Sequence, residues 1–229
     1  MTMAPLLLPS RNMMTKTNIL DGRGKSPTTA RRKPLQARAR KRHGQILDTT
    51  AELLEKVGVD DLTTVLIAKT LNISVGSLYH YFPNKIAILY ALAQRWLDEI
   101  TLALDDINAT LVDQEDLTHF TEHCTERLLE VYRRQRGILH LVQAMFSIPE
   151  LRELDEEHDE FMIDRFGNMF IRLGFNLDNK ELKRIARIYL ELIHALSMEI
   201  VEQKGMQASK TIDDLNSMAY ALLAKYHTA

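Results

Sequence analysis

Cysteine, glycine and proline are all scarce in this chain of 229 residues, which contains 1 Cys, 9 Gly and 6 Pro. The lone Cys124 cannot form a disulfide within the chain, which excludes the disulfide framework of small secreted domains. The shortage of glycine and proline argues against a turn-rich sandwich and against a nucleotide fold with glycine-rich loops. Leu, Ile, Ala, Glu and Lys are abundant and favour helices, so the composition predicts an all-α protein.

Long apolar runs are missing as well. A markedly apolar uncharged stretch runs from Gly137 to Pro149, but it is interrupted by His140 and Gln143 and falls short of the roughly 18 apolar residues that a membrane span needs. No apolar segment is followed by the small residues of a signal-peptide cleavage site. Together with the single cysteine, these features lead us to expect a soluble, cytoplasmic protein with no membrane partner.

The net charge of −2 hides a strong asymmetry along the chain. Residues 1–43 carry 11 Lys and Arg against one Asp, a charge of +10, so residues 44–229 carry −12. The basic end suits a polyanion such as DNA, which the acidic remainder would repel. Residues 1–34 show no helical or strand-like period, so we expect a disordered basic arm there, which either follows the DNA backbone or remains a solvated tail.

Several short helices are predicted near the start of the periodic region. An apolar stripe from residue 46 to residue 57 indicates a helix that ends at Gly58. Capping residues then precede three apolar clusters, at Thr63–Thr64, Ser74 and Asn84. The turn between the second and third helices contains Asn72, which tolerates a positive φ, and this arrangement is typical of a helix-turn-helix. From residue 96 onward we expect about five longer helices, with breaks near 113, 136–137, 149, 174–179 and 205–209.

Residues 62–90 resemble the DNA-binding domain of the tetracycline-repressor-like (TetR) family of bacterial transcription regulators, and the similarity covers roughly residues 40–95. The run from Leu78 to Lys85, LYHYFPNK, matches the family signature Leu-Tyr-x-x-Phe-x-x-Lys without a gap. The resemblance implies a helix-turn-helix DNA-binding domain over 35–95, after the arm at 1–34. It also implies a helical effector-binding and dimerisation domain over 96–229.

The residue types of the third short helix make physical sense for DNA binding. Small residues at its start would let the helix backbone enter the major groove. The hydroxyls of Tyr79 and Tyr81 can reach phosphates. Lys85 lies in the first turn of the following helix, where the helix dipole disfavours a cation, so a DNA phosphate is the expected partner.

The family resemblance assigns a role to each matching position. Thr64 is expected to contact the DNA backbone or a base edge, and Val75, Gly76 and Ser77 are expected to face bases. Phosphate contacts are assigned to Tyr79, Tyr81 and Lys85, with His80 as an additional candidate. Val65 departs from members that place a polar base-reading residue there, because it cannot donate a hydrogen bond. Base reading is therefore expected to depend on the third helix, with Val75 meeting a thymine methyl group.

Dimerisation is expected because one such domain buries too little DNA for high affinity, so two copies bind a palindrome. Apolar stripes occupy residues 180–203 and 211–226, and the family pairs its last two helices in a four-helix bundle between subunits. An alternative is that these stripes only fill the core of one chain. The residues that we predict near the homodimer interface are Tyr189, Leu192, Leu196, Ile200, Met218 and Leu222.

An effector pocket is implied by the family for the helices between these regions. It would hold a small, often apolar molecule whose binding moves the two DNA-binding domains out of register. Met and aromatic residues at helical spacing are, however, also typical of an ordinary core. The predicted pocket residues are Phe120, Tyr132, His140, Met145, Phe146, Phe166, Met169 and Phe170, with Phe161 and Met162 nearby. The acidic run at 155–160 is interpreted as a solvated helix face.

One competing motif points to an enzyme. His119, Glu122 and His123 fit the H-x-x-E-H spelling of a zinc-peptidase helix. No third ligand stands out beyond ordinary acids such as Glu126 and Glu130, and the sequence has no glycine-rich phosphate loop, G-x-S-x-G elbow or C-x-x-C pair. A metal-dependent hydrolase and a helical adaptor without DNA function therefore remain alternatives. The favoured interpretation is a non-enzymatic, ligand-responsive regulator, more often a repressor, without a metal or other cofactor.

Overall fold

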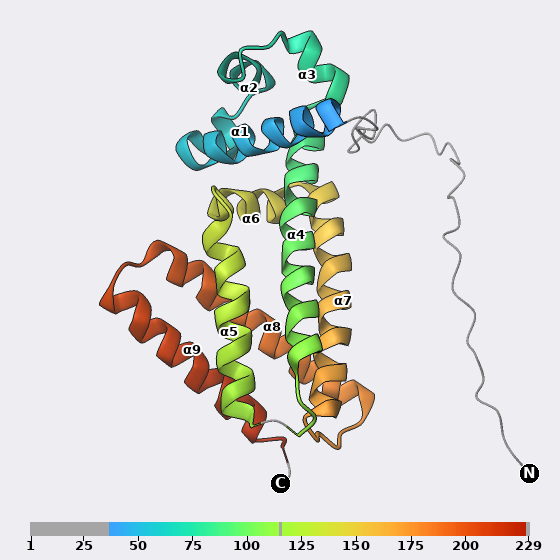
Figure 1. Ribbon diagram of the computed structural model, residues 1–229, viewed down its shortest axis with the longest axis vertical. Coiled ribbons are helices and arrows are strands. Elements are labelled where there is room, and N and C mark those ends of the chain that lie inside the picture. Colours follow the sequence, from blue (N-terminus) through green and yellow to red (C-terminus); the bar gives the residue numbers. More distant parts are fainter. Residues whose placement is uncertain (1–36, 115, 228–229) are drawn as a thin grey trace, which may run out of the picture.

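The computed structural model describes residues 37–114 and 116–227, and throughout these ranges the regular structure is helical (Figure 1). The all-α prediction is confirmed. The basic arm predicted at 1–34 lies outside the described residues. In chain order the helices are α1 (Ala37–Asp61), α2 (Thr64–Thr70), α3 (Val75–Tyr81), α4 (Lys85–Thr110), α5 (Leu117–Arg134), α6 (Ile138–Ser147), α7 (Pro149–Arg172), α8 (Asn179–Glu202) and α9 (Met206–Ala224).

The helices form a small head on a longer body (Figure 1). Helices α1, α2 and α3 make the head, and α4 runs from the head along the body beside α5 and α7. The short helix α6 lies crosswise between α1 and the rest of the body, in contact with α1 and α7. Helix α8 packs on α7 and α5, and α9 packs on α8 and α5. No helix in the described ranges combines the length and hydropathy needed to cross a bilayer.

Local capping sets the boundaries of the short helices, as predicted. Oγ1 of Thr63 accepts a hydrogen bond from the Leu66 amide at 3.1 Å, and Oγ of Ser74 accepts one from the Ser77 amide at 3.0 Å. Each bond satisfies an amide that has no partner in the first helical turn. The turn between α2 and α3 depends on Asn72, whose φ is 52°. The helix-turn-helix therefore forms from its own local sequence.

The head has no linker to the body. Helix α4 is continuous from Lys85 to Thr110, so the domain boundary predicted between 95 and 96 falls inside a helix. The start of α6 also supports α1 closely, because a Cβ on Gly137 would lie 2.9 Å from the Ala51 carbonyl oxygen. The head is therefore connected to the body through the continuous α4 and through the close contact of the start of α6 with α1.

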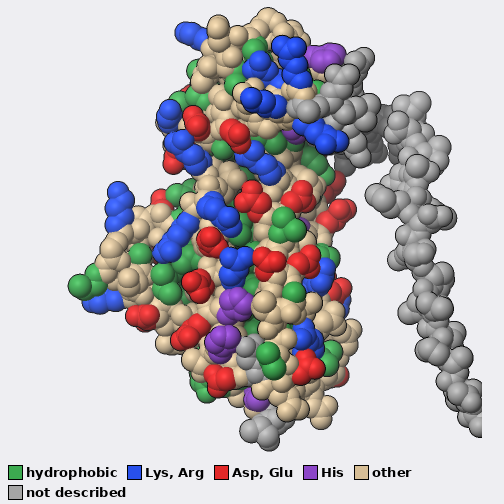
Figure 2. All heavy atoms as spheres, viewed as in Figure 1, with side chains coloured by type: hydrophobic (Ala, Val, Ile, Leu, Met, Phe, Trp, Pro, Cys, Tyr) green, Lys and Arg blue, Asp and Glu red, His purple; other side chains and the backbone are tan. Residues whose placement is uncertain are grey.

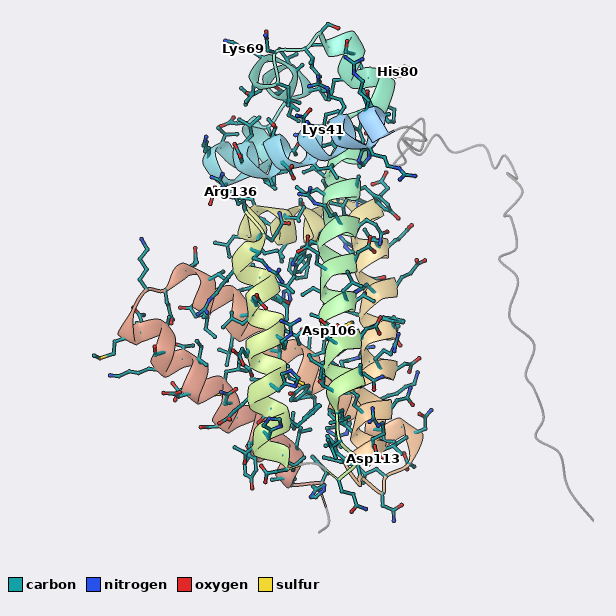
Figure 3. All side chains as sticks on the ribbon, viewed as in Figure 1. Lys41, Lys69, His80, Asp106, Asp113 and Arg136 are labelled. Carbon is teal, nitrogen blue, oxygen red and sulfur yellow. The ribbon has the colours of Figure 1, made fainter. Side chains whose placement is uncertain are left out.

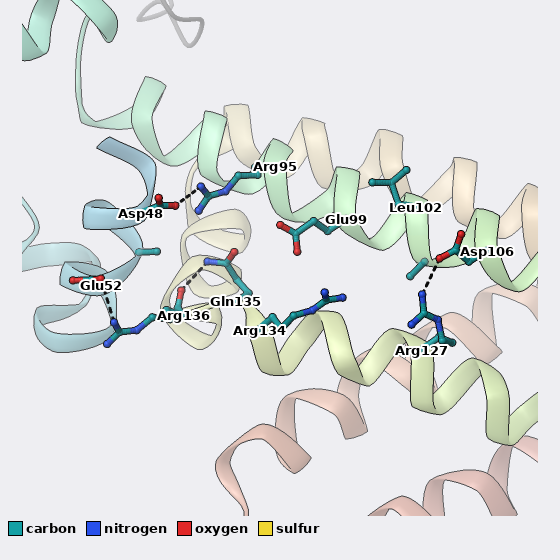
Figure 4. A pocket seen from close by; sticks show the side chains of 12 residues that line it. Asp48, Glu52, Arg95, Glu99, Leu102, Asp106, Arg127, Arg134, Gln135 and Arg136 are labelled. Atoms are coloured by element: carbon teal, nitrogen blue, oxygen red, sulfur yellow. Dashed lines mark hydrogen bonds and ion pairs between the residues drawn. The ribbon is translucent and has the colours of Figure 1, made fainter. Parts of the chain in front are cut away.

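Ion pairs bridge a groove at this junction, which Figure 4 shows from close by. Nη1 of Arg95 on α4 lies 2.6 Å from Oδ1 of Asp48 on α1. Arg136, between α5 and α6, contacts Glu52 and Glu55 of α1. These pairs link α1 to α4 and to the segment between α5 and α6. Because these side chains are partly exposed, each pair contributes little to stability.

Candidate nucleic-acid interface and central cavity

The outer face of α3 carries the small and hydroxyl-bearing residues that the sequence singled out. Gly76, Ser77 and His80 are exposed, and Tyr79 is 38% exposed. Leu78 on the opposite face is fully buried and anchors the helix to the head. Val75 and Tyr81 lie half-buried at the two ends of the helix. The short helix thus presents an accessible backbone at its start, as entry into a major groove requires.

Two of the predicted contact residues lie side by side. Oγ1 of Thr64, at the start of α2, is 3.2 Å from the hydroxyl oxygen of Tyr79 on α3. The hydrogen bond joins hydroxyls that are 15 residues apart in the sequence. Both hydroxyls therefore face one patch of the head, where a single phosphate could meet them. Neighbouring Val65 is 60% exposed, which leaves an apolar side chain available on α2.

A groove with basic side chains runs from α1 to α3. Arg38, Lys41 and Arg42 line it on α1, opposite Ser77, His80 and Tyr81 on α3. In Figure 3, Lys41, Lys69 and His80 lie at the head end, and Asp113 lies at the far end of the body. The chain has no acidic residue between Asp61 and Asp98, and Figure 2 shows Lys and Arg side chains over the head. The face of the head formed by α2, α3 and the start of α1 is therefore suited to a polyanion, while Asp48, Glu52 and Glu55 of α1 pair with Arg95 and Arg136 at the junction with the body.

Lys85 has a partner within the chain that the sequence did not reveal. Its Nζ donates a hydrogen bond of 3.0 Å to the carbonyl oxygen of Val59, which follows the kink of α1 at Gly58 (φ 71°). This backbone carbonyl gives the ammonium group an acceptor within the chain. The prediction that Lys85 needs an external anion is therefore wrong. An ammonium group has three donors, so a phosphate contact in addition to this bond remains a prediction.

A cavity of about 80 Å³ lies inside the body, between α4, α5, α7 and α8, with α6 at its edge. Of the eight predicted pocket residues, Tyr132 and Phe146 line it, and Phe146 is 62% exposed. The remaining wall was not predicted as a pocket, apart from Met162, which the sequence placed nearby. It consists of Trp96, Leu97, Ile100, Asp155, His158, Asp159, Met162, Leu190, Glu191 and His194.

The other predicted pocket residues lie elsewhere, and the prediction is corrected for them. The rings of Phe120, Phe166 and Phe170 pack around Tyr189, with centroids 6.1, 5.1 and 5.6 Å from its ring. These side chains, with Met145 and Met169, form solid core. His140 lies under the head, where its ring is 3.6 Å from a Cβ built on Gly58. Phe161 is exposed and stacks with Arg165. Helical spacing could not distinguish core from cavity because both need apolar side chains facing inward.

The acidic run at 155–160 is also more than a solvated face. Glu156, Glu157 and Glu160 are exposed as expected, but Asp155 and Asp159 are half-buried on the cavity wall. Burial, reinforced by Glu191 and Glu156, raises the pKa of Asp155 to about 6. Burial, reinforced by Asp155 and Glu191, raises the pKa of Asp159 to about 7. The spacing 155, 159, 162 marks one helix face, and this was the signal in the sequence.

Neutral polar groups complete the cavity wall. The Tyr132 hydroxyl lies 2.7 Å from Nδ1 of His194, and Nε2 of His158 lies 3.0 Å from Oγ1 of Thr101. Burial lowers the pKa of both imidazoles. The backbone of Leu97 and the charge of Asp98 only partly oppose this for His158, and the charge of Glu191 only partly opposes it for His194. Both rings are therefore mainly uncharged at neutral pH.

The predicted dimer residues divide into two groups. Tyr189 and Ile200 are fully buried inside a single chain, so they belong to its own core and the prediction is corrected for them. Leu192, Leu196 and Leu222 are half-buried, and Met218 is 52% exposed. Ile188 and Tyr220, which were not among the predicted residues, are exposed on the same two helices. The apolar stripes predicted the two helices correctly, but the most apolar side of each helix packs into the core of the same chain.

The zinc-peptidase motif does not assemble a site. The rings of His119 and His123 have centroids 6.1 Å apart on α5, and Glu122 is exposed beside a groove between α5 and α9. In the described part of the chain, no three His, Cys, Asp or Glu residues are placed to hold a metal ion. The hydrolase interpretation therefore lacks its third ligand.

Comparison with known proteins assigns both parts of the chain. The family described as "Bacterial regulatory proteins, tetR family" matches residues 46–92, and "Tetracyclin repressor-like, C-terminal domain" matches residues 116–223. The HTH-type transcriptional regulator BetI of Pseudomonas aeruginosa (strain LESB58) is 31% identical over 78 residues, covering 34% of this chain and 40% of BetI. The tetracycline repressor protein class C of Escherichia coli is 36% identical over 75 residues, covering 33% of this chain and 32% of the repressor. The chain thus matches two fifths or less of these curated relatives.

Solved structures share the fold over a larger part of the chain. A TetR-like transcriptional regulator from Rhodococcus sp. RHA1 has a TM-score of 0.65 at 17% identity, covering 83% of this chain and 98% of that one. The TetR-family transcriptional regulator PfmR from Thermus thermophilus has a TM-score of 0.59 at 19% identity, covering 78% of this chain and 97% of PfmR. The hydrolase alternative is overturned, because the regulators that match are non-enzymatic transcription factors. With both of its parts matched, the chain belongs to the TetR family of DNA-binding transcriptional regulators.

Proposed function

We propose that the protein is a homodimeric repressor that binds a palindromic operator and leaves it when a small molecule enters the cavity of the body. The outer face of α3 carries this proposal, because small residues and hydroxyls are exposed there while Leu78 is buried behind them. Thr64, Val75, Gly76, Ser77, Tyr79, His80, Tyr81 and Lys85 are the proposed DNA contacts. We expect the protein in the cytoplasm, where bacterial DNA lies.

The dimer in this proposal uses the outer faces of α8 and α9. Exposed Ile188 and Met218, with half-buried Leu192, Leu196 and Leu222, offer an apolar surface on adjacent helices. A partner copy that covers this surface would bring two heads to one duplex, as a palindrome requires. The domain division at 35–95 and 96–229 is a functional proposal, since α4 belongs to both parts.

Release by an effector is supported by the connections between the cavity and the head. Helix α4 supplies Trp96 to the cavity and Arg95 to the ion pair with α1. Helix α6 supplies Phe146 to the cavity edge and begins just after Gly137, which supports α1. A ligand that displaces either helix would change the angle of the head. Such a ligand shifts the population only if it binds the protein with different affinity in the two orientations of the head.

A selection experiment tests the DNA-binding proposal. The full chain is used to enrich operators from a random duplex pool, and binding is then measured by fluorescence anisotropy across a salt series. We expect a palindromic motif. Ser77→Leu should abolish operator binding because a bulky side chain at the start of α3 blocks entry into the groove. Asn176→Leu, in the exposed loop between α7 and α8, is the matched control and should bind normally. Enrichment of no motif, or full binding by Ser77→Leu, would contradict the proposal.

A further inference from the structure

The cavity in the body has acidic groups without a matching cation. Asp155 and Asp159 on α7 and Glu191 on α8 contribute three carboxylates to its wall, and none of the described residues that line it is Lys or Arg. Arg187, the basic side chain whose charge reaches Asp159, is ion-paired with Glu160 on the exposed side of α7. The imidazoles on the same wall are mainly neutral, because burial lowers their pKa values. Above about pH 7, where both Asp155 and Asp159 have released their protons, the cavity therefore has a negative potential that no Lys or Arg on its described wall neutralises.

Aromatic rings form a second wall beside the carboxylates. The ring planes of Trp96 and Tyr132 stand at 87° to each other with centroids 5.4 Å apart, which makes a corner of two rings. Phe146 lies at the cavity edge. Faces of Trp and Tyr attract cations, most strongly where water is excluded. Trp96 is only 2% exposed, so its ring is shielded from bulk water on this wall.

We propose that this cavity binds a small organic cation, an ammonium group with short alkyl substituents, held by Asp155, Asp159 and Glu191 and by the rings of Trp96 and Tyr132. The inference rests on the proposed function in so far as this cavity is the effector site. It adds the chemical class of the effector, which differs from the apolar molecule that the family resemblance implies.

Size and chemistry separate this ligand from others. A volume of about 80 Å³ suits a compact head group and is far below the roughly 300 Å³ or more of a site for a drug-sized molecule. A metal ion does not fit, because the residues described include no cluster of three donors with the geometry to bind one. At pH 8, where these groups are ionised, an anion would face three carboxylates, and a neutral molecule would leave their charge uncompensated. An alkylammonium ion pairs with the carboxylates and also contacts the aromatic rings.

The experiment uses the natural fluorescence of the site, because Trp96 is the only tryptophan of the chain. The full protein is titrated at pH 8 with three compounds of similar shape but different charge: tetramethylammonium, tert-butanol and pivalate. We expect a saturable change in Trp96 emission with tetramethylammonium, at least about 10-fold tighter than with the neutral compound, and none with the anion. Equal or tighter binding of tert-butanol or pivalate, or no saturable response to tetramethylammonium, would overturn the proposal.

Variants test whether the carboxylates hold the cation. Asp155→Asn with Asp159→Asn keeps the shape of the cavity and removes two charges, so tetramethylammonium should bind about 10-fold or more weaker. Glu126→Gln, an exposed acid on α5 outside this cavity, is the matched control and should bind as the parent protein does. Circular dichroism checks that both variants are folded. Unchanged affinity in the folded double variant would remove these carboxylates from the site.

A DNA measurement separates this inference from the proposed function. Tetramethylammonium is added to the complex of the parent protein with its selected operator. Release of the DNA at concentrations that saturate the fluorescence change supports both the cation site and its role as the effector site. A saturable fluorescence change without release supports the cation site and contradicts its role as the effector site. Release without any fluorescence response supports an effector action elsewhere and contradicts the cation site.

Discussion

The hydroxyl oxygen of Tyr132 on α5 lies 2.7 Å from Nδ1 of His194 on α8, and this pair forms part of the cavity wall. The Tyr132 ring also stands at 87° to the ring of Trp96 on α4, with centroids 5.4 Å apart. One hydrogen bond and one ring contact thus connect α5 to α8 and to α4 beside the cavity. A ligand that enters this space must meet α4, the helix that continues into the head.

The first prediction concerns this hydrogen bond. Tyr132→Phe removes the hydroxyl and leaves His194 Nδ1 without its partner, so the free energy of unfolding should fall by about 1 kcal/mol. Urea denaturation followed by circular dichroism measures the change. Tyr220→Phe is the matched control, because Tyr220 is exposed on α9 and should lose little. A Tyr132→Phe protein as stable as the control would show that the bond contributes nothing.

The second prediction follows from the raised pKa values of Asp155, about 6, and Asp159, about 7, against an ordinary value of 3.8. Between about pH 4 and pH 7 the folded state keeps protons that the unfolded chain has released, so the free energy of unfolding falls as pH rises through this window. Replacing both residues with Asn removes this loss. The free energy of unfolding of the double variant should exceed that of the parent by about 1–2 kcal/mol at pH 8, since partial exposure to solvent reduces the effect. Near pH 4 the two proteins should be equally stable.

Thermal or urea unfolding at several pH values checks this dependence. Glu126→Gln, at an exposed position on α5, should follow the parent at every pH. A double variant whose advantage stayed constant from pH 4 to pH 8 would show that the two carboxyl groups titrate normally in the folded protein.

Local features of the fold were predictable from the sequence, and the cavity was not. Ser74 and Asn84 cap their helices through bonds to amides three residues later, so each boundary is encoded within a few positions. The cavity, in contrast, is formed by side chains from five helices, and no local pattern indicates that they converge. The same holds for Lys85, whose partner Val59 is 26 residues away.

Burial in the body shows a related limit. Tyr189 follows the helical stripe of α8 and was expected near the dimer interface, yet Phe120, Phe166 and Phe170 surround it within one chain. The periodicity of a stripe reports that a face is covered, and it does not report which element covers it. Only the packing of α5 and α7 on α8 distinguishes these cases.

The third prediction tests the support of the head by the body. Gly137 has a φ of 67°, and a Cβ there would lie 2.9 Å from the Ala51 carbonyl oxygen and 3.0 Å from the Glu55 amide nitrogen. Both atoms belong to the backbone of α1 and cannot rotate away. Gly137→Ala should therefore lower the free energy of unfolding by about 2 kcal/mol or more, from the strained backbone and the displaced helix.

Gly44 provides the matched control for this change. It lies within α1 with open space around its Cβ position, so Gly44→Ala should leave stability unchanged or raise it by up to about 1 kcal/mol. Urea denaturation of both variants gives the comparison. Equal stability of the two alanine variants would show that α6 does not press against α1.

The fourth prediction separates the two roles of Lys85. Lys85→Met removes the bond to the Val59 carbonyl, which should cost about 1 kcal/mol of stability. If the ammonium group also contacts a phosphate, operator affinity falls similarly for all sequences and the salt dependence decreases by about one ion. Anisotropy titrations across a salt series measure the slope. An unchanged slope together with reduced stability would assign Lys85 to the fold alone.

The last prediction concerns the surface of α9. Met218 is 52% exposed, so Met218→Glu places a carboxylate where folding of one chain does not need an apolar group. In a dimer that pairs α8 and α9 across a two-fold axis, each subunit contributes residue 218 to the same apolar interface. The substitution therefore buries two carboxylates there, which is strongly unfavourable. Sedimentation velocity at micromolar protein should then show the monomer, with operator affinity reduced. Leu102→Glu, at an exposed apolar position on α4, should remain dimeric. A Met218→Glu protein that stays dimeric and binds the operator normally would place the interface on another face.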